Sequence, residues 1–226
     1  KFHLLFQSAE EIKSSAKIKG QTPGLGDRKY VDLNGRDAKG VLTNSPDGFI
    51  DEADRVPIGQ AMPDVTFGVI NNFRFKGFDF SFFIQGMAGN DLINANLFEI
   101  GSLNGETNVL KEYWENRWTP QNTNTIYPKV NPSERNIFSD AQVESGSFIR
   151  IKNISLGYTI PASLLKKIRI NQLRIYASAN NIYNFTKYSG FDPELFAFGQ
   201  SSLLQGVDYG GYPMSRTIFA GIQISF

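Results

Sequence analysis

Oxygen-bearing side chains between positions 32 and 54 have the spacing of a calcium-binding loop. Once residues 36–46 are left out as an insertion, aspartate or asparagine stands at loop positions 1, 3, 5, 9 and 12, and glycine stands at position 6. Hard carboxylate and carbonyl oxygens suit Ca²⁺, and the glycine permits the sharp bend of the loop. The sequence therefore predicts a structural calcium site. Its ligands would be Asp32, Asn34, Asp47, Asp51, Asp54 and the backbone carbonyl of Phe49.

Two departures leave a second interpretation of this segment open. The insertion at 36–46 interrupts the loop, and Asp54 at position 12 is shorter than the usual bidentate glutamate. The alternative is a turn rich in aspartate and asparagine whose side chains satisfy its own backbone. If calcium binds, its role is to brace the segment rather than to catalyse.

The chain offers little for catalysis. It has no cysteine and a single histidine, His3, which excludes zinc sites built from His and Cys and nucleophilic sites built from Ser–His–Asp or Cys–His. No pair of carboxylates is set apart by its spacing. The 23 basic and 22 acidic side chains nearly balance, so no nucleic-acid partner is expected. We therefore expect a protein that is not an enzyme.

Three aromatic side chains form a candidate platform for a ligand. Tyr113, Trp114 and Trp118 lie at helical spacing within residues 108–118, and Thr119-Pro120 would end that helix. Such rings could stack on a sugar. The alternative, which we favour, is that this is a loop helix that buries its aromatic face against the mouth of a β-barrel, the fold inferred below.

The elements that would carry these residues are β-strands. In residues 215–226 apolar side chains occupy every second position up to the last residue, while the intervening positions are small, polar or aromatic. A transmembrane β-barrel strand needs this period, with apolar side chains toward lipid and small or polar ones toward the lumen. An amphipathic edge strand of a soluble sandwich is the alternative. The apolar positions are Ile218, Ala220, Ile222, Ile224 and Phe226.

Further segments alternate in the same way. Residues 65–75 and 78–85 flank Lys76-Gly77 and predict a hairpin. Residues 148–158 predict a strand whose apolar phase shifts, which indicates a bulge near Asn153. Two more strands are expected at 171–181 and at 1–7, the latter as the end of a sixth strand, and a short helix is expected at 9–18.

The connections between the expected strands alternate strictly between long and short. Residues 76–77 and 159–170 are the short ones. In outer-membrane barrels short turns face the periplasm and long loops face the outside. This order predicts an all-β transmembrane antiparallel barrel with long extracellular loops and a periplasmic carboxy terminus. The long connections are residues 8–63, 89–146 and 183–214.

Several strings resemble SusC/RagA-type TonB-dependent outer-membrane transporters, in the right order along nearly the whole chain. They include Asp27-Arg-Lys-Tyr-Val-Asp-Leu-Asn-Gly, Arg117-Trp-Thr-Pro, Gly146-Ser-Phe-Ile-Arg-Ile-Lys-Asn-Ile-Ser-Leu-Gly-Tyr, Asn180-Asn-Ile-Tyr-Asn-Phe and Gly190-Phe-Asp-Pro-Glu. Residues 36–46 depart from the pattern as an insertion.

The resemblance implies a barrel of about 22 strands with an amino-terminal plug. Such transporters import oligosaccharides or peptides across the outer membrane of Gram-negative bacteria, with a SusD-like lipoprotein as lid and energy supplied through TonB. The chain starts without a secretory signal, and five or six strands cannot close a barrel without exposing strand edges to lipid. We therefore expect residues 1–226 to be the carboxy-terminal segment of a larger barrel, paired with its amino-terminal part. A non-transporting barrel with adhesive or structural loops is the alternative.

Overall fold

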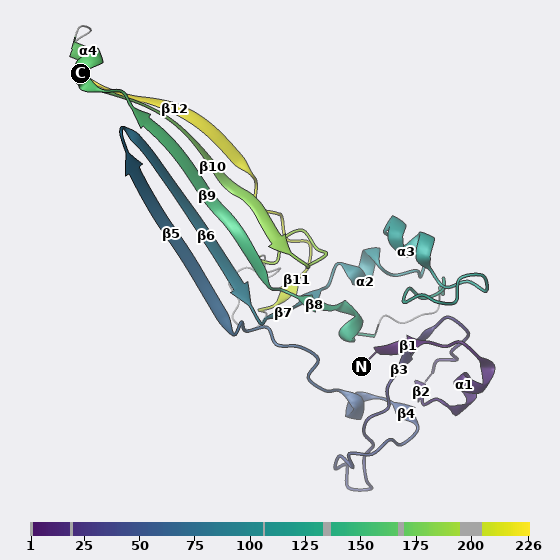
Figure 1. Cartoon of the computed structure of the whole chain (residues 1–226). Helices are drawn as coiled ribbons and strands as arrows, with labels where there is room; N and C mark the ends of the chain where they lie inside the picture. Colours follow the sequence, from purple (N-terminus) through teal and green to yellow (C-terminus); the bar gives the residue numbers. More distant parts are fainter. Residues whose placement is uncertain (1, 19, 106, 133–136, 167–169, 195–204) are drawn as a thin grey trace. The chain divides into compact units, whose positions relative to one another are not determined.

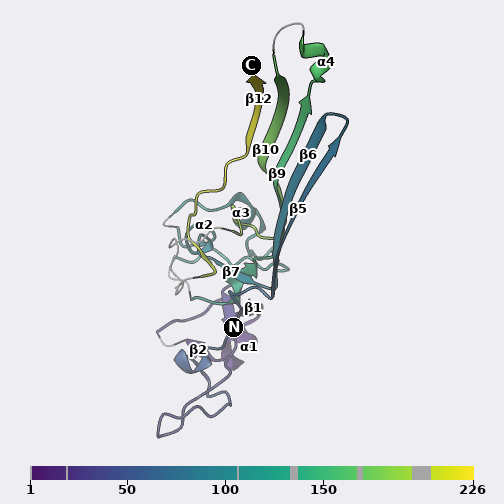
Figure 2. The ribbon, with the colours of Figure 1, turned by 90° about the vertical axis from the view of Figure 1, so that its left-hand side faces the viewer.

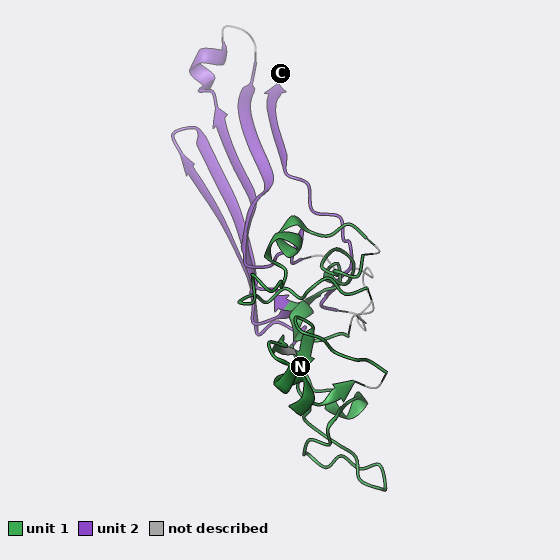
Figure 3. Ribbon diagram, turned by 90° about the vertical axis from the view of Figure 1, so that its right-hand side faces the viewer, with its two compact units in different colours: residues 1–59, 93–143 green, residues 60–92, 144–226 purple. Residues whose placement is uncertain are grey.

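The structure, a computed structural model, describes residues 2–18, 20–105, 107–132, 137–166, 170–194 and 205–226 (Figure 1). The chain divides into two compact units that are interleaved in sequence. Unit 1 contains residues 1–59 and 93–143, and unit 2 contains residues 60–92 and 144–226 (Figure 3).

Unit 2 is dominated by one antiparallel sheet of five long strands (Figure 1, Figure 2). Their order across the sheet is β12-β10-β9-β6-β5, so strands that follow one another along the chain are neighbours. This meander confirms the expected all-β architecture. The strands are β5 (Val65–Phe75), β6 (Phe78–Ala88), β9 (Phe148–Thr159), β10 (Gln172–Thr186) and β12 (Thr217–Ser225).

A two-residue turn joins β5 to β6, as the sequence predicts. Lys76 and Gly77 both have positive φ, 48° and 88°, which is the conformation of the type I′ turn favoured in tight hairpins. The connection from β9 to β10 leaves the same end of the sheet, because Phe78 pairs with Tyr158 and Arg174 pairs with Thr159. Both short connections therefore lie at one end, and the long segments leave from the other.

The bulge expected near Asn153 is present in β9. Phe83 of β6 pairs with Asn153, but the next residue of β6, Ile84, pairs with Ile151. Lys152 is therefore an extra residue with no partner on β6. The extra residue restores the apolar phase, so the apolar side chains of β9 stay on one face along its whole length. These are Ile149, Ile151, Ile154, Leu156 and Tyr158.

Strand β10 is longer than the sequence predicts. Its register against β9 also shifts, between Asn180 and Tyr183, and Asn181 has a left-handed φ of 49°. The alternation of apolar and polar side chains breaks at this point, so the sequence predicts a strand only over residues 171–181. The strand resumes beyond the irregularity and continues to Thr186. The prediction that a loop starts at residue 183 is therefore wrong.

The two faces of the sheet differ in chemistry. One face carries apolar side chains from all five strands and leaves many of them open: Ile218 is 75% exposed and Phe75 is 70% exposed. The paired rows on this face, such as Phe80, Leu156 and Ala177, are apolar across neighbouring strands. The other face carries mostly polar or small side chains, such as Ser81, Ser155 and Ser178. A few large apolar side chains, such as Ile70 and Phe83, also lie on it.

Unit 1 consists of short elements. Strand β1 (Phe2–Leu5) pairs with β3 (Arg28–Tyr30), and β2 (Lys17–Ile18) pairs in parallel with β4 (Phe49–Ile50). The prediction that residues 1–7 end a sixth strand of the large sheet is wrong in this structure, because β3 is the partner of β1. Buried apolar side chains of this unit include Leu5, Phe6, Ala53 and Leu103.

Helices are few and short. Helix α1 (Ala9–Ser14) starts where the sequence predicts and ends early, because Lys17 and Ile18 enter strand β2. Helix α3 (Lys111–Asn116) occupies the middle of the expected 108–118 helix. The other helices within the described residues are α2 (Leu97–Ile100), α4 (Ala162–Leu165) and the 3₁₀ turns η1 (Glu52–Asp54) and η2 (Asp140–Gln142).

A smaller sheet has three strands in the order β11-β7-β8. They are β11 (Val207–Asp208), β7 (Asp91–Asn94) and β8 (Val143–Ser145).

Among the described residues, no helix combines the length and the apolar character needed to cross a membrane.

Candidate functional site

The polar face of the five-stranded sheet carries a hydrogen-bonded network near its middle. Asn153 of β9 donates to the side-chain oxygen of Asn180 at 2.7 Å and to the hydroxyl of Ser178 at 3.2 Å. Ser178 in turn donates to the carbonyl of Ile154 at 3.1 Å. These groups come from neighbouring strands and lie on the face opposite the exposed apolar side chains. Such a face suits contact with water or a polar ligand.

An ion pair lies on the same face near the short turns. The guanidinium of Arg174 forms two hydrogen bonds with the carboxylate of Asp79 and lies 4.9 Å from the ring centre of Tyr176. Gly157 lies between them on β9, and a Cβ atom there would meet both members of the pair. The absence of a side chain at this position therefore permits the pair to form across β9.

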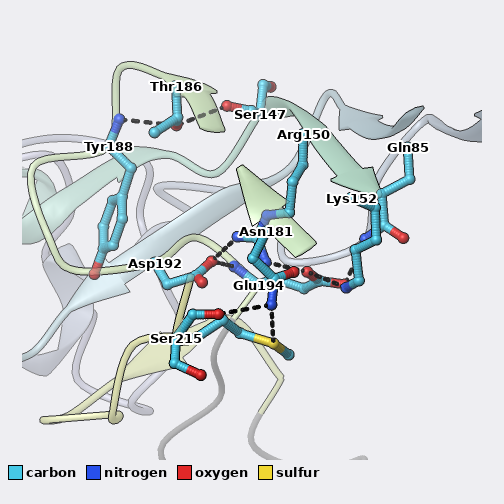
Figure 4. Close-up of polar contacts among 11 residues, drawn as sticks. Gln85, Ser147, Arg150, Lys152, Asn181, Thr186, Tyr188, Asp192, Glu194 and Ser215 are labelled. Atoms are coloured by element: carbon cyan, nitrogen blue, oxygen red, sulfur yellow. Dashed lines mark hydrogen bonds and ion pairs between the residues drawn. The ribbon is translucent and has the colours of Figure 1, made fainter. Parts of the chain in front are cut away.

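A second charged cluster lies on the polar face near the end from which the long segments leave (Figure 4). Arg150 of β9 is 2% exposed, and its guanidinium pairs with Asp192 and, at 2.7 Å, with Glu194. Lys152 lies 3.3 Å from the same Glu194 carboxylate, and Gln85 donates to it at 2.6 Å. Two cations and two carboxylates thus balance at a largely buried site.

The segment that carries these carboxylates is held at further points. The hydroxyl of Tyr188 donates to Asp208 at 2.6 Å, and Asp208 has no exposed surface. The backbone and the hydroxyl of Ser189 both donate to Glu144 at 2.7 Å. Burial and the neighbouring Asp208 carboxylate raise the pKa of Tyr188 above its ordinary value of 10, so its hydroxyl stays a donor even in alkaline solution.

The aspartates expected to bind calcium accept hydrogen bonds from backbone N–H groups with their carboxylates. Asp54 accepts from Leu33 at 2.6 Å, from Asn34 at 3.1 Å and from Asp51 at 2.9 Å. Asp32 accepts from the N–H groups of residues 47 and 48, and the carboxylates of residues 47 and 51 accept from residues 49 and 53. This is the self-satisfied turn that the sequence left open as the alternative.

The described residues contain no group of three or more acidic, histidine or cysteine side chains that could hold a metal ion. The four aspartates among the expected ligands therefore do not converge on one point in this structure. The calcium site stays a prediction. If it forms in solution, chelation of calcium will make residues 32–54 more sensitive to protease while the sheet stays intact. Equal sensitivity with and without chelator would contradict it.

Asp54 is expected to make this segment sensitive to acid. Burial alone would raise the pKa of its carboxyl, but the N–H groups of Asp51, Leu33 and Asn34 outweigh burial and lower the pKa below its ordinary value of 3.8. A lowered folded-state pKa stabilises the segment above about pH 3.8 and loses that contribution as pH falls through the lower value. We expect the protection factors of the amides of residues 33–51, which are exchange rates relative to the unfolded chain at the same pH, to fall below that pH. Asp54→Asn should loosen the same amides at neutral pH, by on the order of 2 kcal/mol. Hydrogen exchange measures both effects, and unchanged exchange in the variant would contradict the role of Asp54.

The expected aromatic platform is only partly assembled. Tyr113 packs edge-on against Tyr127 with ring centres 4.7 Å apart. Trp114 is 50% exposed, but the guanidinium of Arg117 covers one of its faces at 3.8 Å. Trp118 lies beyond the end of α3 and donates to Gln7 at 3.2 Å.

Trp118 also limits its neighbour Gly26. A Cβ atom on Gly26 would lie 2.5 Å from the indole, and the φ of Gly26 is 80°. Trp118 thus fills space within its own unit. Of the three residues, Trp114 has the most accessible ring, and the assignment of these residues to substrate stays a prediction.

The Arg150 cluster was not expected from the sequence. The string Gly190-Phe-Asp-Pro-Glu carries its acidic residues and, in the sequence, indicates only a family resemblance. A usable signal was present in β9, where Arg150 and Lys152 alternate with Ile149 and Ile151. Two cations on one face of a strand whose other side chains are uncharged indicate acidic partners elsewhere in the chain.

Comparison with known proteins connects this two-faced sheet to a family. No family model matches the chain. The TonB-dependent receptor P3 of Formosa agariphila is 35% identical over 226 residues, which is 98% of this chain and 21% of the relative. The receptor P26 of the same organism is 31% identical over the whole chain. SusC of Bacteroides thetaiotaomicron is 24% identical over 88% of the chain.

Solved structures agree with the relatives. A structure of the RagAB peptide importer in the open-open state matches all of the chain with a TM-score of 0.67 and 25% identity, over 22% of the solved chain. The chain belongs to the SusC/RagA family of TonB-dependent receptors. Receptors of this family are outer-membrane proteins, and the five-stranded sheet is a portion of their β-barrel. The chain spans about a fifth of the length of the curated relatives it matches.

The family assignment defines the faces of the sheet. In an outer-membrane barrel apolar side chains face lipid, and the polar side chains face the lumen. The Arg150 cluster, the Asp79–Arg174 pair and the asparagine–serine network are therefore on the lumen-facing side of the SusC/RagA barrel wall.

Proposed function

We propose that the receptor containing this chain imports an oligosaccharide or a peptide across the outer membrane. The chain would supply the last strands of the barrel, and its long connections would help to capture the cargo outside the cell. Its role would be transport and not enzymatic. The single observation that carries this proposal is the sheet with one apolar and one polar face, in a chain that matches the structure of a peptide importer along its whole length.

The partners follow from the same family. We propose that a SusD-like lipoprotein closes over the receptor, that TonB supplies energy through the amino-terminal region, and that the remaining barrel strands pair with β5 and β12. Both of these strands are edges of the described sheet, and an unpaired edge in lipid would leave backbone groups without hydrogen-bond partners.

We also propose an orientation. The end of the sheet with the short connections would be periplasmic, and so would the carboxy terminus. Residues 8–63, 89–146 and the connection after β10 would be extracellular. This proposal is supported by the connections, because both short ones leave the same end of the sheet.

Copurification tests the assembly. The receptor should be extracted from outer membranes in mild detergent and everything that accompanies it identified by intact mass. We expect an amino-terminal barrel portion, continuous or separate, and a surface lipoprotein. Recovery of the 25.3 kDa chain alone and monodisperse would contradict the proposal.

Uptake tests the activity and the cargo class. Cells with and without the receptor gene should be given labelled peptide mixtures and labelled oligosaccharide mixtures, each with and without a functional TonB. We expect uptake of one class that requires both proteins. The likeness to a peptide importer supports the peptide arm, whereas the likeness to SusC does not favour either class. The alternative, an adhesive or structural barrel, predicts no uptake of either class.

A further inference from the structure

Residues 188–194 form a segment, here called the strap, that lies on the polar face of the sheet. It follows β10 and is fixed at its start, where the backbone of Tyr188 donates to Thr186 at 3.1 Å and Thr186 donates to the carbonyl of Ser147 at 2.9 Å. Figure 4 shows these contacts together with the charged cluster at the other end of the strap. Pro193 within it is fully buried.

Arg150 is the group that holds the far end of the strap. Its side chain is 3% exposed and contacts carboxylates from two strap residues, Asp192 and Glu194. Asp192 also accepts from the backbone N–H of Glu194 at 3.0 Å, so one carboxylate fixes both the side chain of Arg150 and the local turn. Such charge-assisted contacts are strong and directional.

The bulge in β9 adds a second cation to this contact. Lys152, the extra residue, reaches the same carboxylate of Glu194 as Arg150 does. Gln85 of β6, which pairs with Arg150 across the ladder, donates to the other oxygen of Glu194. Glu194 thus meets three donors from two strands. Removing Arg150 would leave two carboxylates with insufficient compensation at a buried site, which is strongly unfavourable.

The position of the strap gives it a role in transport. Arg150 lies near the start of β9, at the end of the sheet opposite the short turns. In the proposed orientation, this is the outer end of the lumen wall, which cargo reaches first. A fixed segment on that wall defines the shape of the passage, whereas a released segment does not.

We propose that Arg150 is a positioning residue for cargo capture, because it fixes the strap on the lumen wall at the outer end of the barrel. This inference rests on the proposed import function. It assigns to the Gly190–Glu194 string a structural task, namely docking onto Arg150, Lys152 and Gln85. Arg150 itself need not touch the cargo.

Hydrogen exchange of the full receptor tests the anchoring. In Arg150→Gln we expect the strap amides to exchange on the order of 100-fold faster, because a buried charge pair has been broken. Arg150→Lys should restore part of the protection, since lysine keeps the charge but cannot pair with both carboxylates in the same geometry. Arg174→Gln is the matched control: it removes an arginine from a different place on the polar face, where its partner is Asp79, and should leave strap exchange unchanged. Unchanged strap exchange in Arg150→Gln would overturn the proposal.

A second variant distinguishes release of the strap from failure of the receptor to assemble. In Arg150→Gln alone, the two uncompensated carboxylates are expected to lower the amount of assembled receptor. In Arg150→Gln combined with Asp192→Asn and Glu194→Gln, the unpaired carboxylates are gone, so receptor abundance should return to the wild-type level. The strap should still exchange faster than in the wild type, since no charge pair remains. Wild-type protection in this triple variant would show that the charges do not hold the strap.

Uptake kinetics test the positioning role. In receptor-normalised cells, Arg150→Gln should raise the half-saturating cargo concentration about tenfold and leave the maximal rate unchanged, as expected when binding is weakened equally in the ground state and in the rate-limiting transition state. A released strap with unchanged uptake would overturn the positioning role while the import function stands. Absence of uptake in the wild type would overturn the import function and, with it, this role, whereas the exchange result would still decide the anchoring.

Discussion

Replacing Leu156 by arginine should sharply reduce the amount of receptor assembled in the outer membrane. Leu156 is 50% exposed on the apolar face, and its neighbours in the row are Phe80 and Ala177. An arginine that faces lipid near the middle of a barrel strand costs about 2–4 kcal/mol. Quantitative mass spectrometry of outer membranes measures the assembled receptor, and unfolding in lipid vesicles measures the free-energy difference.

The neighbouring residue provides the control. Ser155 lies on the same strand but on the polar face, between Ser81 and Ser178. Ser155→Arg adds the same charge in a row of small polar side chains, where it can reach the water of the lumen. We expect near-normal assembly of this variant. Equal loss of receptor in both variants would show that the two faces do not meet different environments.

Gly77→Val should destabilise the hairpin of β5 and β6. Gly77 has a φ of 88°, and a Cβ atom there would lie 2.8 Å from the carbonyl oxygen of Thr159. A branched side chain in a left-handed conformation costs on the order of 1–3 kcal/mol, and the clash adds to that cost because the carbonyl belongs to the backbone. Thr159 also donates its N–H to the carbonyl of Gly77 at 2.8 Å, so the turn and the end of β9 would be disturbed together.

Lys76→Asn is the matched change in the same turn. Its φ of 48° suits asparagine, and Asn-Gly is a preferred pair for a type I′ turn. We expect this variant to be as stable as the wild type or slightly more stable in denaturant unfolding of the lipid-embedded receptor. Similar midpoints for the asparagine and valine variants would contradict the conformational argument.

The long strands could be predicted because their signal is local. In β5, β6 and β12 each strand shows its two faces through its own alternation, without knowledge of its neighbours. The bulge at Asn153 was also readable, since a shift of the apolar phase within one strand requires an extra residue. In β10 the irregularity between Asn180 and Tyr183 interrupts the alternation. The sequence therefore predicts a strand that ends at Asn181, although β10 continues to Thr186.

Pairing between distant segments could not be predicted in the same way. Nothing in residues 2–5 indicates that β3 is their partner rather than a strand of the large sheet. Arg150 and Asp192 are 42 residues apart, and only the folded chain brings them together. The Asp/Asn segment illustrates a different limit, because side chains that cap backbone N–H groups can have the same spacing as calcium ligands.

Spin-label scanning of β12 in the full receptor, reconstituted in lipid, tests the central claim most directly. Labels would be placed one at a time at residues 217–225, and their accessibility to oxygen and to a water-soluble nickel complex compared. We predict a period of two, with oxygen access highest at Ile218, Ala220, Ile222 and Ile224 and nickel access highest at the positions between them. Equal access of both reagents along the strand, without alternation, would contradict the assignment of this sheet to a membrane-spanning barrel wall.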